Sequence, residues 1–290
     1  MPPASRADGD AVLAHRTTGR GPRLVLVHGF TQNARAWGPF ADLLAAHHQV
    51  VAVDLPGHGG SDGVVASLPE AADLVAAVGA AGGGRDDRIG HEVRADYLGY
   101  SLGGRVALHL ALSRPASVRR LVVVGATAGI EDPDERARRR RDDDATADRL
   151  ERAARDIGCD AALDAFLHRW LSQPLFATLT PVQAELDARL GNTVAGLASS
   201  LRTCGTGTQA PLWDRLRDLA MPVLVVAGAL DERYAPIARR MAQAIGANAQ
   251  VALVPGAGHA CHLERPAYTA RLVESFLGDP HLGDPHLGDP

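Results

Sequence analysis

The sequence lacks the features that mark several classes of protein. Only three of its 290 residues are cysteine, Cys159, Cys204 and Cys261, which are too few and too scattered for a disulfide framework. No apolar run approaches the ~18 residues that span a bilayer. The start of the chain, MPPASRADGDAV, has no apolar segment typical of a signal peptide. We therefore expect a cytoplasmic protein with no membrane insertion.

The chain also has little excess charge of either sign. Charged residues make up 22% of it, and the formal net charge is −4. Neither value is typical of a disordered chain or of a protein built to bind nucleic acid. A hydrophobic content of 46% suits one sizeable domain, or a core domain with an inserted subdomain. We expect no nucleic-acid partner, and the sequence leaves the oligomeric state unknown.

Short apolar, β-branched runs recur along the chain, and each is followed by a glycine-rich turn. Continuous apolar strands are covered on both faces, which is typical of a parallel sheet. Helical patterns alternate with these runs, so the sequence predicts an α/β fold with a mostly parallel, doubly wound sheet. The predicted strands are 23–29, 49–57, 95–101, 119–125, 221–228 and 249–256, and the predicted helices are 37–46, 102–113, 235–245 and 266–277.

Between about residues 131 and 210 the strand pattern stops, and only helical patterns occur. They cover 133–157, 161–171, 181–191 and 193–201. A helical block inserted into an α/β alternation indicates a lid over the carboxyl ends of the strands. We expect a core in two parts, 1–130 and 211–277, with a helical lid at 131–210 between them.

Two segments have the composition of irregular structure. Residues 80–92 are rich in glycine and charge and predict a surface loop. Residues 278–290 belong to a tandem LGDPH repeat with a proline in every unit and no apolar periodicity. We expect this tail to be disordered and to have no catalytic role.

GYSLG, residues 99–103, fits the G-x-S-x-G pattern of a nucleophile elbow around Ser101. A predicted strand precedes it and a predicted helix follows. A serine on so tight a turn needs small neighbours, which the flanking glycines supply. The motif alone is weak, because a serine in an ordinary turn between strand and helix would look the same.

Asp231 and His259 follow Ser101 in the order that a Ser-Asp-His triad on this scaffold requires. Each comes just after a predicted strand, at the sheet edge that also carries Ser101. An imidazole can take the serine proton, and a carboxylate can fix the imidazole tautomer. Asp231 could instead cap the next helix, and HACH, residues 259–262, could be half of a metal site. No third ligand has suitable spacing, so we expect no metal.

Phe30 lies in the turn HGF after the first apolar strand. Its backbone N–H and that of Leu102 are the natural donors of an oxyanion hole. A plain turn after a strand is the alternative interpretation of this segment.

The chain resembles the α/β-hydrolase superfamily over nearly its whole length. Within it, the chain looks most like the 2-succinyl-6-hydroxy-2,4-cyclohexadiene-1-carboxylate (SHCHC) synthases of menaquinone biosynthesis. The triad motifs occur throughout the superfamily, whereas the elbow helix and the lid motifs are more specific. The resemblance rests on VHGFTQNARAWGPF, VDLPGHGGSD, LGYSLGGRVAL, GATAGIEDPDERARRRRDD, RWLSQPLFATL, LGNTVAGLASSLR and VPGAGHACHLERP.

The resemblance implies elimination rather than hydrolysis. In that family a ring proton next to a succinyl carbonyl is removed, and the resulting enolate expels pyruvate and leaves a conjugated diene. The resemblance gives His259 the role of deprotonating Ser101, and Ser101 that of taking the substrate proton. Oxyanion-hole donors would suit the enolate oxygen as well as a tetrahedral intermediate. The resemblance implies that the reaction needs no cofactor.

The implied substrate is a small molecule with three carboxylates, which arginines bind well in bidentate fashion. The resemblance supplies Arg105, Arg139 and Arg189 as candidate ligands, with Tyr100 and Trp170 at family pocket positions. Other interpretations stay open: Arg105 could pair with a carboxylate beside its helix, Arg189 could be a solvated helix residue, and Trp170 could belong to the lid core.

Arg139 lies in a run of four arginines, residues 138–141, between acidic clusters. A helix turns about 100° per residue, so the four cannot share a face. Arg139 precedes Leu150 by eleven residues, which places it within about 20° of the downstream apolar stripe. We therefore expect Arg139 to face the protein body and its three arginine neighbours to be solvated.

Two other functions fit the scaffold. One is a carboxylesterase or carbon–carbon bond hydrolase that uses Ser101 as nucleophile. The other is a non-catalytic binding protein, against which the intact set Ser101, Asp231 and His259 argues. The chain departs mildly from the family after Asp231, where Arg233-Tyr234 replaces a usual Lys-Phe, and it has an insertion near 82–91.

Overall fold

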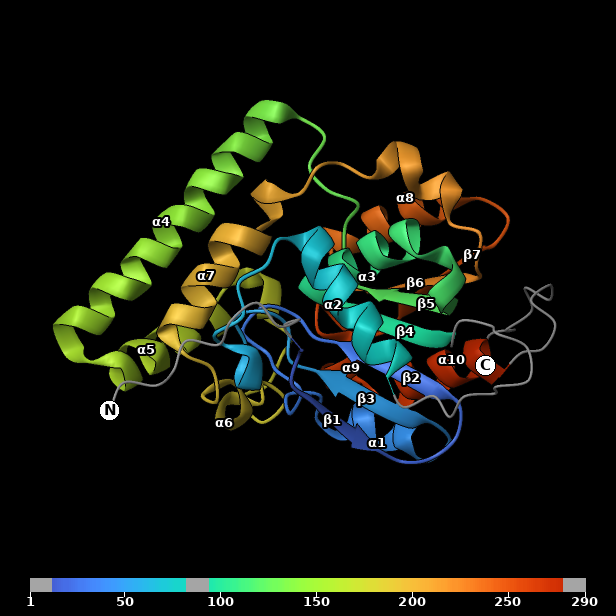
Figure 1. The fold of residues 1–290 in the computed structure, drawn as a ribbon, viewed down its shortest axis with the longest axis horizontal. Coiled ribbons are helices and arrows are strands. Elements are labelled where there is room, and N and C mark those ends of the chain that lie inside the picture. The colour runs from blue at the N-terminus through green and yellow to red at the C-terminus, as the bar shows by residue number, and fades with distance from the viewer. Residues whose placement is uncertain (1–11, 82–93, 279–290) are drawn as a thin grey trace.

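Seven strands form one sheet in the computed structural model, which describes residues 12–81 and 94–278 (Figure 1). The strand order is β1-β3-β2-β4-β5-β6-β7; β1 is antiparallel to β3, and the other pairs are parallel. This confirms the predicted α/β fold. The strands are β1 His15–Thr18, β2 Arg23–Val27, β3 Gln49–Val53, β4 Ala95–Tyr100, β5 Val118–Val124, β6 Val223–Gly228 and β7 Ala249–Val254.

The six predicted strands are all present, but most end earlier than predicted. The residues after each strand form turns at the carboxyl edge instead of continuing the ladder. The edge strand β1 was not predicted, because its sequence HRTT is polar and exposed. The predicted loop at 80–92 lies almost wholly outside the described residues, and so does the repeat tail beyond residue 278.

Helices cover both faces of the sheet. Helices α2 (Leu68–Ala80), α3 (Leu102–Ser113) and α8 (Tyr234–Ile245) pack on one face. Helices α1 (Pro39–Ala45), α9 (Cys261–Glu264) and α10 (Pro266–Gly278) pack on the other. Successive residues of β2 pack alternately into the hydrophobic cores on the two faces of the sheet, as the two-residue period of a strand requires. Helix α2 was missed from sequence, although a capping box at Ser67 and Glu70 starts it.

Residues 131–210, here called the helical segment, leave the sheet after β5 and return before β6. They hold α4 (Pro133–Ile157), α5 (Cys159–Leu171), α6 (Leu186–Arg189) and α7 (Val194–Cys204). Figure 1 shows α4 as a long helix beside the sheet, and α5 and α7 pack against it. No helix in the described part of the chain is long and apolar enough to cross a membrane.

The bounds of α4 are those predicted, and its first turn is capped by the Asp132 side chain, which accepts from the N–H of Glu135 at 2.7 Å. The predicted helix at 181–191 is wrong over most of its length, because only α6 is helical there. Glu185 has a left-handed backbone with φ 53°, which interrupts the helical path just before α6.

Gly103 allows α3 to start directly against the sheet. A Cβ at this position would overlap the carbonyl oxygens of Val27 and His28, which are backbone atoms that cannot turn aside. Gly99 is restricted in the same way, because a Cβ there would overlap the carbonyl of Gly103. The glycines of the GYSLG motif are therefore required by packing as well as by the turn.

Replacing Gly103 by Ala should lower the free energy of unfolding by about 3 kcal/mol, because the backbone of β2 and α3 must separate. Gly63→Ala is the matched control, since nothing lies within 4 Å of a Cβ at Gly63. Urea denaturation of both variants tests this expectation. Equal midpoints for the two variants would contradict it.

Candidate active site

Ser101 occupies the turn between β4 and α3. Its backbone has φ 51° and ψ −108°, a conformation that is uncommon for a residue with a side chain. Its N–H donates to the carbonyl of Val124 at 2.9 Å, which ties the turn to β5. Strained residues of this kind gather at functional sites. The turn leaves the Ser101 hydroxyl in the wall of a cavity at the N-terminus of α3.

The structure brings Asp231 and His259 to Ser101 from the turns after β6 and β7. His259 Nδ1 lies 2.8 Å from Asp231 Oδ2, and His259 Nε2 lies 3.4 Å from Ser101 Oγ. The carboxylate accepts, so Nδ1 carries the proton and Nε2 is left to accept from the serine. The second distance is long, as is common for such pairs without substrate.

Asp231 remains a carboxylate at neutral pH. Burial acts to raise the pKa of Asp231, but the hydrogen bond from His259 and the N–H groups of Tyr234 and Arg233 outweigh it and lower the pKa. Those N–H groups lie 2.9 and 3.2 Å from Asp231 Oδ1. Asp231 thus also caps the turn into α8, so the two roles considered from sequence are compatible.

Phe30 and Leu102, the residues expected to donate to an oxyanion, both lie in the cavity wall. Among the described residues, the N–H groups of Phe30 and Leu102 have no hydrogen-bond acceptor, and both residues line the cavity. The peptide plane that carries the Phe30 N–H is fixed through the Gly29 carbonyl. That oxygen accepts from the N–H of Gln32 at 3.1 Å and from His28 Nδ1 at 2.8 Å.

The tautomer of His28 follows from its neighbours. The N–H of Leu55 can only donate, and it lies 3.0 Å from His28 Nε2. Nε2 is therefore the acceptor, and Nδ1 carries the proton that reaches Gly29. Complete burial lowers the pKa of His28 to about 4, so the ring is neutral near pH 7.

A cavity of about 220 Å³ lies over the triad, between the sheet edge and the helical segment. All the predicted site residues line it except Asp231, which lies behind His259. The lining residues predicted from sequence are Phe30, Tyr100, Ser101, Leu102, Arg105, Arg139, Trp170, Arg189 and His259.

Arg189 is a buried cation with neutral partners. It is 2% exposed, and it donates to the carbonyl of Ala184 and to the hydroxyl of Thr31. It forms no ion pair within the described ranges. Burial lowers the pKa of Arg189 to about 10, which leaves it charged at neutral pH. Arg189 is therefore not a solvated helix residue, which was the alternative interpretation of the sequence.

Arg105 is held in a similar way. It is 6% exposed, and it donates to the carbonyls of Cys204 at 2.8 Å and Gly205 at 3.4 Å. No carboxylate in the described part of the chain forms an ion pair with it, so the pairing considered from sequence is absent there. Burial lowers the pKa of the Arg105 guanidinium below its ordinary value.

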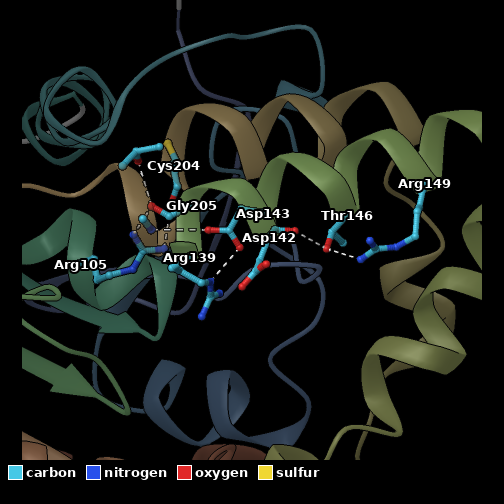
Figure 2. A network of polar contacts seen from close by, with 10 residues as sticks. Arg105, Arg139, Asp142, Asp143, Thr146, Arg149, Cys204 and Gly205 are labelled. Atoms are coloured by element: carbon cyan, nitrogen blue, oxygen red, sulfur yellow. Dashed lines mark hydrogen bonds and ion pairs between the residues drawn. The ribbon is translucent and has the colours of Figure 1, made fainter. Parts of the chain in front are cut away.

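Arg139 points toward the cavity, as the helical count predicted. Arg138, Arg140 and Arg141 are exposed, whereas Arg139 is partly buried and lines the cavity. Figure 2 shows its guanidinium beside Asp143, with Nε 2.9 Å from Asp143 Oδ1. This is its only side-chain hydrogen bond to a described residue, so the two terminal nitrogens of Arg139 have no partner within residues 12–81 and 94–278.

Several residues at this site were not singled out from sequence. Asp143 is 5% exposed and lines the cavity one helical turn after Arg139, a spacing that could have revealed the pair. The rings of Tyr234 and Phe176 lie 4.5 and 5.9 Å from that of His259. No sequence pattern indicates the Phe176 contact, because it joins the helical segment to a distant turn.

Trp170 packs against Phe30 with ring centroids 4.9 Å apart. It therefore belongs to the apolar packing of the helical segment and to the cavity wall at the same time. Tyr100 is 3% exposed, and burial raises the pKa of its hydroxyl well above the ordinary value. No described residue forms a hydrogen bond with that hydroxyl.

His262, the second histidine of HACH, packs against aromatic rings. Within the described ranges no group of three potential ligands is close enough to hold a metal ion. His262 is fully buried, and its ring lies 4.3 Å from that of Tyr100 and 5.3 Å from that of Trp37. Burial, with the nearby charge of Arg189, lowers the pKa of His262 to about 3.

His262 should make the protein less stable in mild acid. The unfolded chain binds a proton at His262 below about pH 6.5, whereas the folded chain does not bind it until about pH 3. The free energy of unfolding should therefore fall by about 1.4 kcal/mol more per pH unit in the parent than in His262→Phe between pH 6 and pH 4. Denaturation at several pH values measures this; parallel curves would contradict it.

The comparisons with known proteins agree with this geometry. Residues 24–272 match the model of the alpha/beta hydrolase family. The SHCHC synthase of Serratia proteamaculans is 32% identical over 89% of this chain and 94% of its own length. That of Salmonella schwarzengrund is 33% identical over 85% of this chain and 90% of its own length.

Among solved structures, MenH from S. aureus superposes with a TM-score of 0.78 at 28% identity, covering 93% of this chain and 98% of that one. These similarities confirm the resemblance indicated by the sequence motifs.

Proposed function

The chain belongs to the alpha/beta hydrolase family, and from this premise we propose that it is an SHCHC synthase of menaquinone biosynthesis. It would eliminate pyruvate from 2-succinyl-5-enolpyruvyl-6-hydroxy-3-cyclohexene-1-carboxylate, and this would make it a carbon–oxygen lyase on a hydrolase scaffold. The observation that carries the proposal is a cavity that opens on Ser101 and is lined by buried arginines. Two of them, Arg105 and Arg189, form no ion pair with any carboxylate in the described part of the chain.

In the proposed reaction the triad acts as a base. His259 Nε2 takes the hydroxyl proton of Ser101, and Ser101 Oγ takes the ring proton beside the succinyl carbonyl. The electron pair moves onto the carbonyl oxygen, which the N–H groups of Phe30 and Leu102 stabilise. The enolate then re-forms the carbonyl, a ring double bond forms, and the bond to the enolpyruvyl oxygen breaks. Protonation of the expelled enolate gives pyruvate.

Three substrate carboxylates would be matched by Arg105, Arg139 and Arg189. A guanidinium in a dry site binds a carboxylate far more strongly than one in water, because the competing solvent is absent. Arg139 has its two terminal nitrogens available, which is the geometry of a bidentate contact. Tyr100 and Trp170 would complete the binding site, with the Tyr100 hydroxyl available as a donor.

The helical segment would serve as the lid of this site. Every arginine proposed to bind substrate except Arg105 lies on it, so lid and substrate recognition would be the same part of the chain. The reaction needs no cofactor, because the electron pair released at the ring carbon leaves with the enolpyruvyl group. A cytoplasmic location fits the role and stays a prediction.

Hydrolysis of an ester or of a carbon–carbon bond is the second candidate. It is supported by the same triad and the same two N–H donors, which suit a tetrahedral intermediate as well as an enolate. In that case Ser101 would be the nucleophile rather than the proton acceptor. The buried cations favour the elimination, since a general esterase has no need of them.

Ser101→Ala should lower pyruvate release from the enolpyruvyl cyclohexene acid by about 10³-fold or more, because the proton acceptor is lost. Pyruvate and the diene absorbance are followed together. Ser113→Ala on the same helix is the control, since Ser113 lies outside the cavity, and it should retain full activity. A fully active Ser101→Ala would refute the mechanism, and a parent that cleaves aryl esters but ignores this acid would favour the hydrolase.

Arg139→Ala should raise KM for the same acid on the order of tenfold to a hundredfold, because a charge-assisted contact to a carboxylate is lost. Arg141→Ala removes the same charge from the exposed face of α4 and should change KM less than about twofold. Steady-state kinetics at constant ionic strength compares the two. Equal effects would mean that the charge of α4, rather than the Arg139 contact, matters.

A further inference from the structure

We infer that Asn192 is a positioning residue for the oxyanion hole: it holds the turn that presents the Phe30 N–H. The inference rests on the proposed function in one respect, which is that pyruvate release is the reaction used to test it. Asn192 follows α6 in the helical segment, is 5% exposed, and does not line the cavity. It acts through Thr31, the residue next to Phe30.

Thr31 is an unfavourable residue type for its place in the turn. The turn Gly29–Gln32 is closed by the N–H of Gln32 on the carbonyl of Gly29 at 3.1 Å. Thr31, its third residue, has φ 68°. A positive φ at this position is normally met by glycine or asparagine, and for a β-branched residue it is strained. Strain of this kind persists only when the surroundings impose it.

The helical segment supplies the contacts that impose it. Asn192 Nδ2 donates to the carbonyl of Thr31 at 2.7 Å and to that of Arg189 at 2.9 Å. Asn192 Oδ1 accepts from the N–H of Gly59 at 2.9 Å. Two carbonyls and one N–H allow a single orientation of the amide. The Arg189 guanidinium donates to the Thr31 hydroxyl. The helical segment therefore holds both the carbonyl and the hydroxyl of Thr31.

The consequence is a mechanical link between substrate recognition and catalysis. Arg189 reaches the cavity and also holds Thr31, and Asn192 joins the backbone of Arg189 to the backbone of Thr31. Without Asn192 the turn can relax toward a conformation that threonine prefers. The Phe30 N–H would then leave the direction required by the developing oxyanion, so the loss would fall on kcat rather than on KM.

The test uses Asn192→Asp, which keeps the shape and the acceptor for Gly59 but cannot donate to the Thr31 carbonyl. Its kcat for pyruvate release should fall on the order of 10- to 100-fold, with KM within about threefold. Asn192→Ala should show the same fall in kcat, and it replaces Asn192→Asp in the test if the aspartate variant does not fold. Asn33→Ala is the matched control, because the Asn33 side chain joins the same two segments through the Ala188 carbonyl and forms no hydrogen bond with Thr31. Its kcat should stay within about threefold of the parent.

Thr31→Gly separates positioning from general stability, since glycine adopts positive φ without strain. In the Thr31→Gly background, Asn192→Asp should lose at least about fivefold less kcat than in the parent, a coupling that the double-mutant cycle measures. Equal losses in both backgrounds, or equal losses in Asn192→Asp and Asn33→Ala, would overturn the inference.

A parent chain that releases no pyruvate would overturn the proposed function alone. The same variants are then compared by their rates of inactivation with phenylmethylsulfonyl fluoride. This reagent requires Ser101 and the same N–H donors, and the same relative losses are expected.

Discussion

The positive φ of the backbone at Ser101 is the constraint on which the rest of the site depends. It turns the chain from β4 into α3 within one residue, and the turn is possible only because α3 begins in contact with the backbone of β2. Leu102, the first residue of α3, and Phe30, in the turn after β2, both line the cavity. Strand β2 and helix α3 are therefore in direct backbone contact beside Ser101, and the turns after β6 and β7 add Asp231 and His259.

Buried charge is the second organising feature. Leaving a guanidinium in a dry site without a counterion costs several kcal/mol of folding free energy. Unpaired buried charges of this kind are therefore concentrated at functional sites. Arg105 and Arg189 lower the cost by donating to carbonyl and hydroxyl oxygens, which keep each side chain in place without neutralising it. Arg139 is different, because Asp143 neutralises it and fixes one edge of the group. The site thus holds two buried positive charges that no described carboxylate neutralises.

The sequence was informative wherever a short-range rule applied. Apolar runs predicted six strands, the three-residue order Ser101, Asp231 and His259 predicted which turns would meet, and helical periodicity separated Arg139 from Arg138 and Arg141. Prediction failed where conformation depends on distant contacts. Nothing in HRTT indicates that β1 pairs with β3, and the Pro181 region has helical composition but ends at the left-handed Glu185. The link from Asn192 to Thr31 joins segments far apart in the chain, so no local pattern contains it.

The run of four arginines has a consequence for comparing relatives of this chain. An alignment that slips by one position within the run still pairs arginine with arginine and loses no similarity score. It would nevertheless match the side chain that faces the cavity with one that faces water. Letter-by-letter conservation in this stretch is therefore uninformative, and equivalence must be assigned from a buried residue outside the charged run, such as Leu150, which follows Arg139 by eleven positions on the inward side of α4.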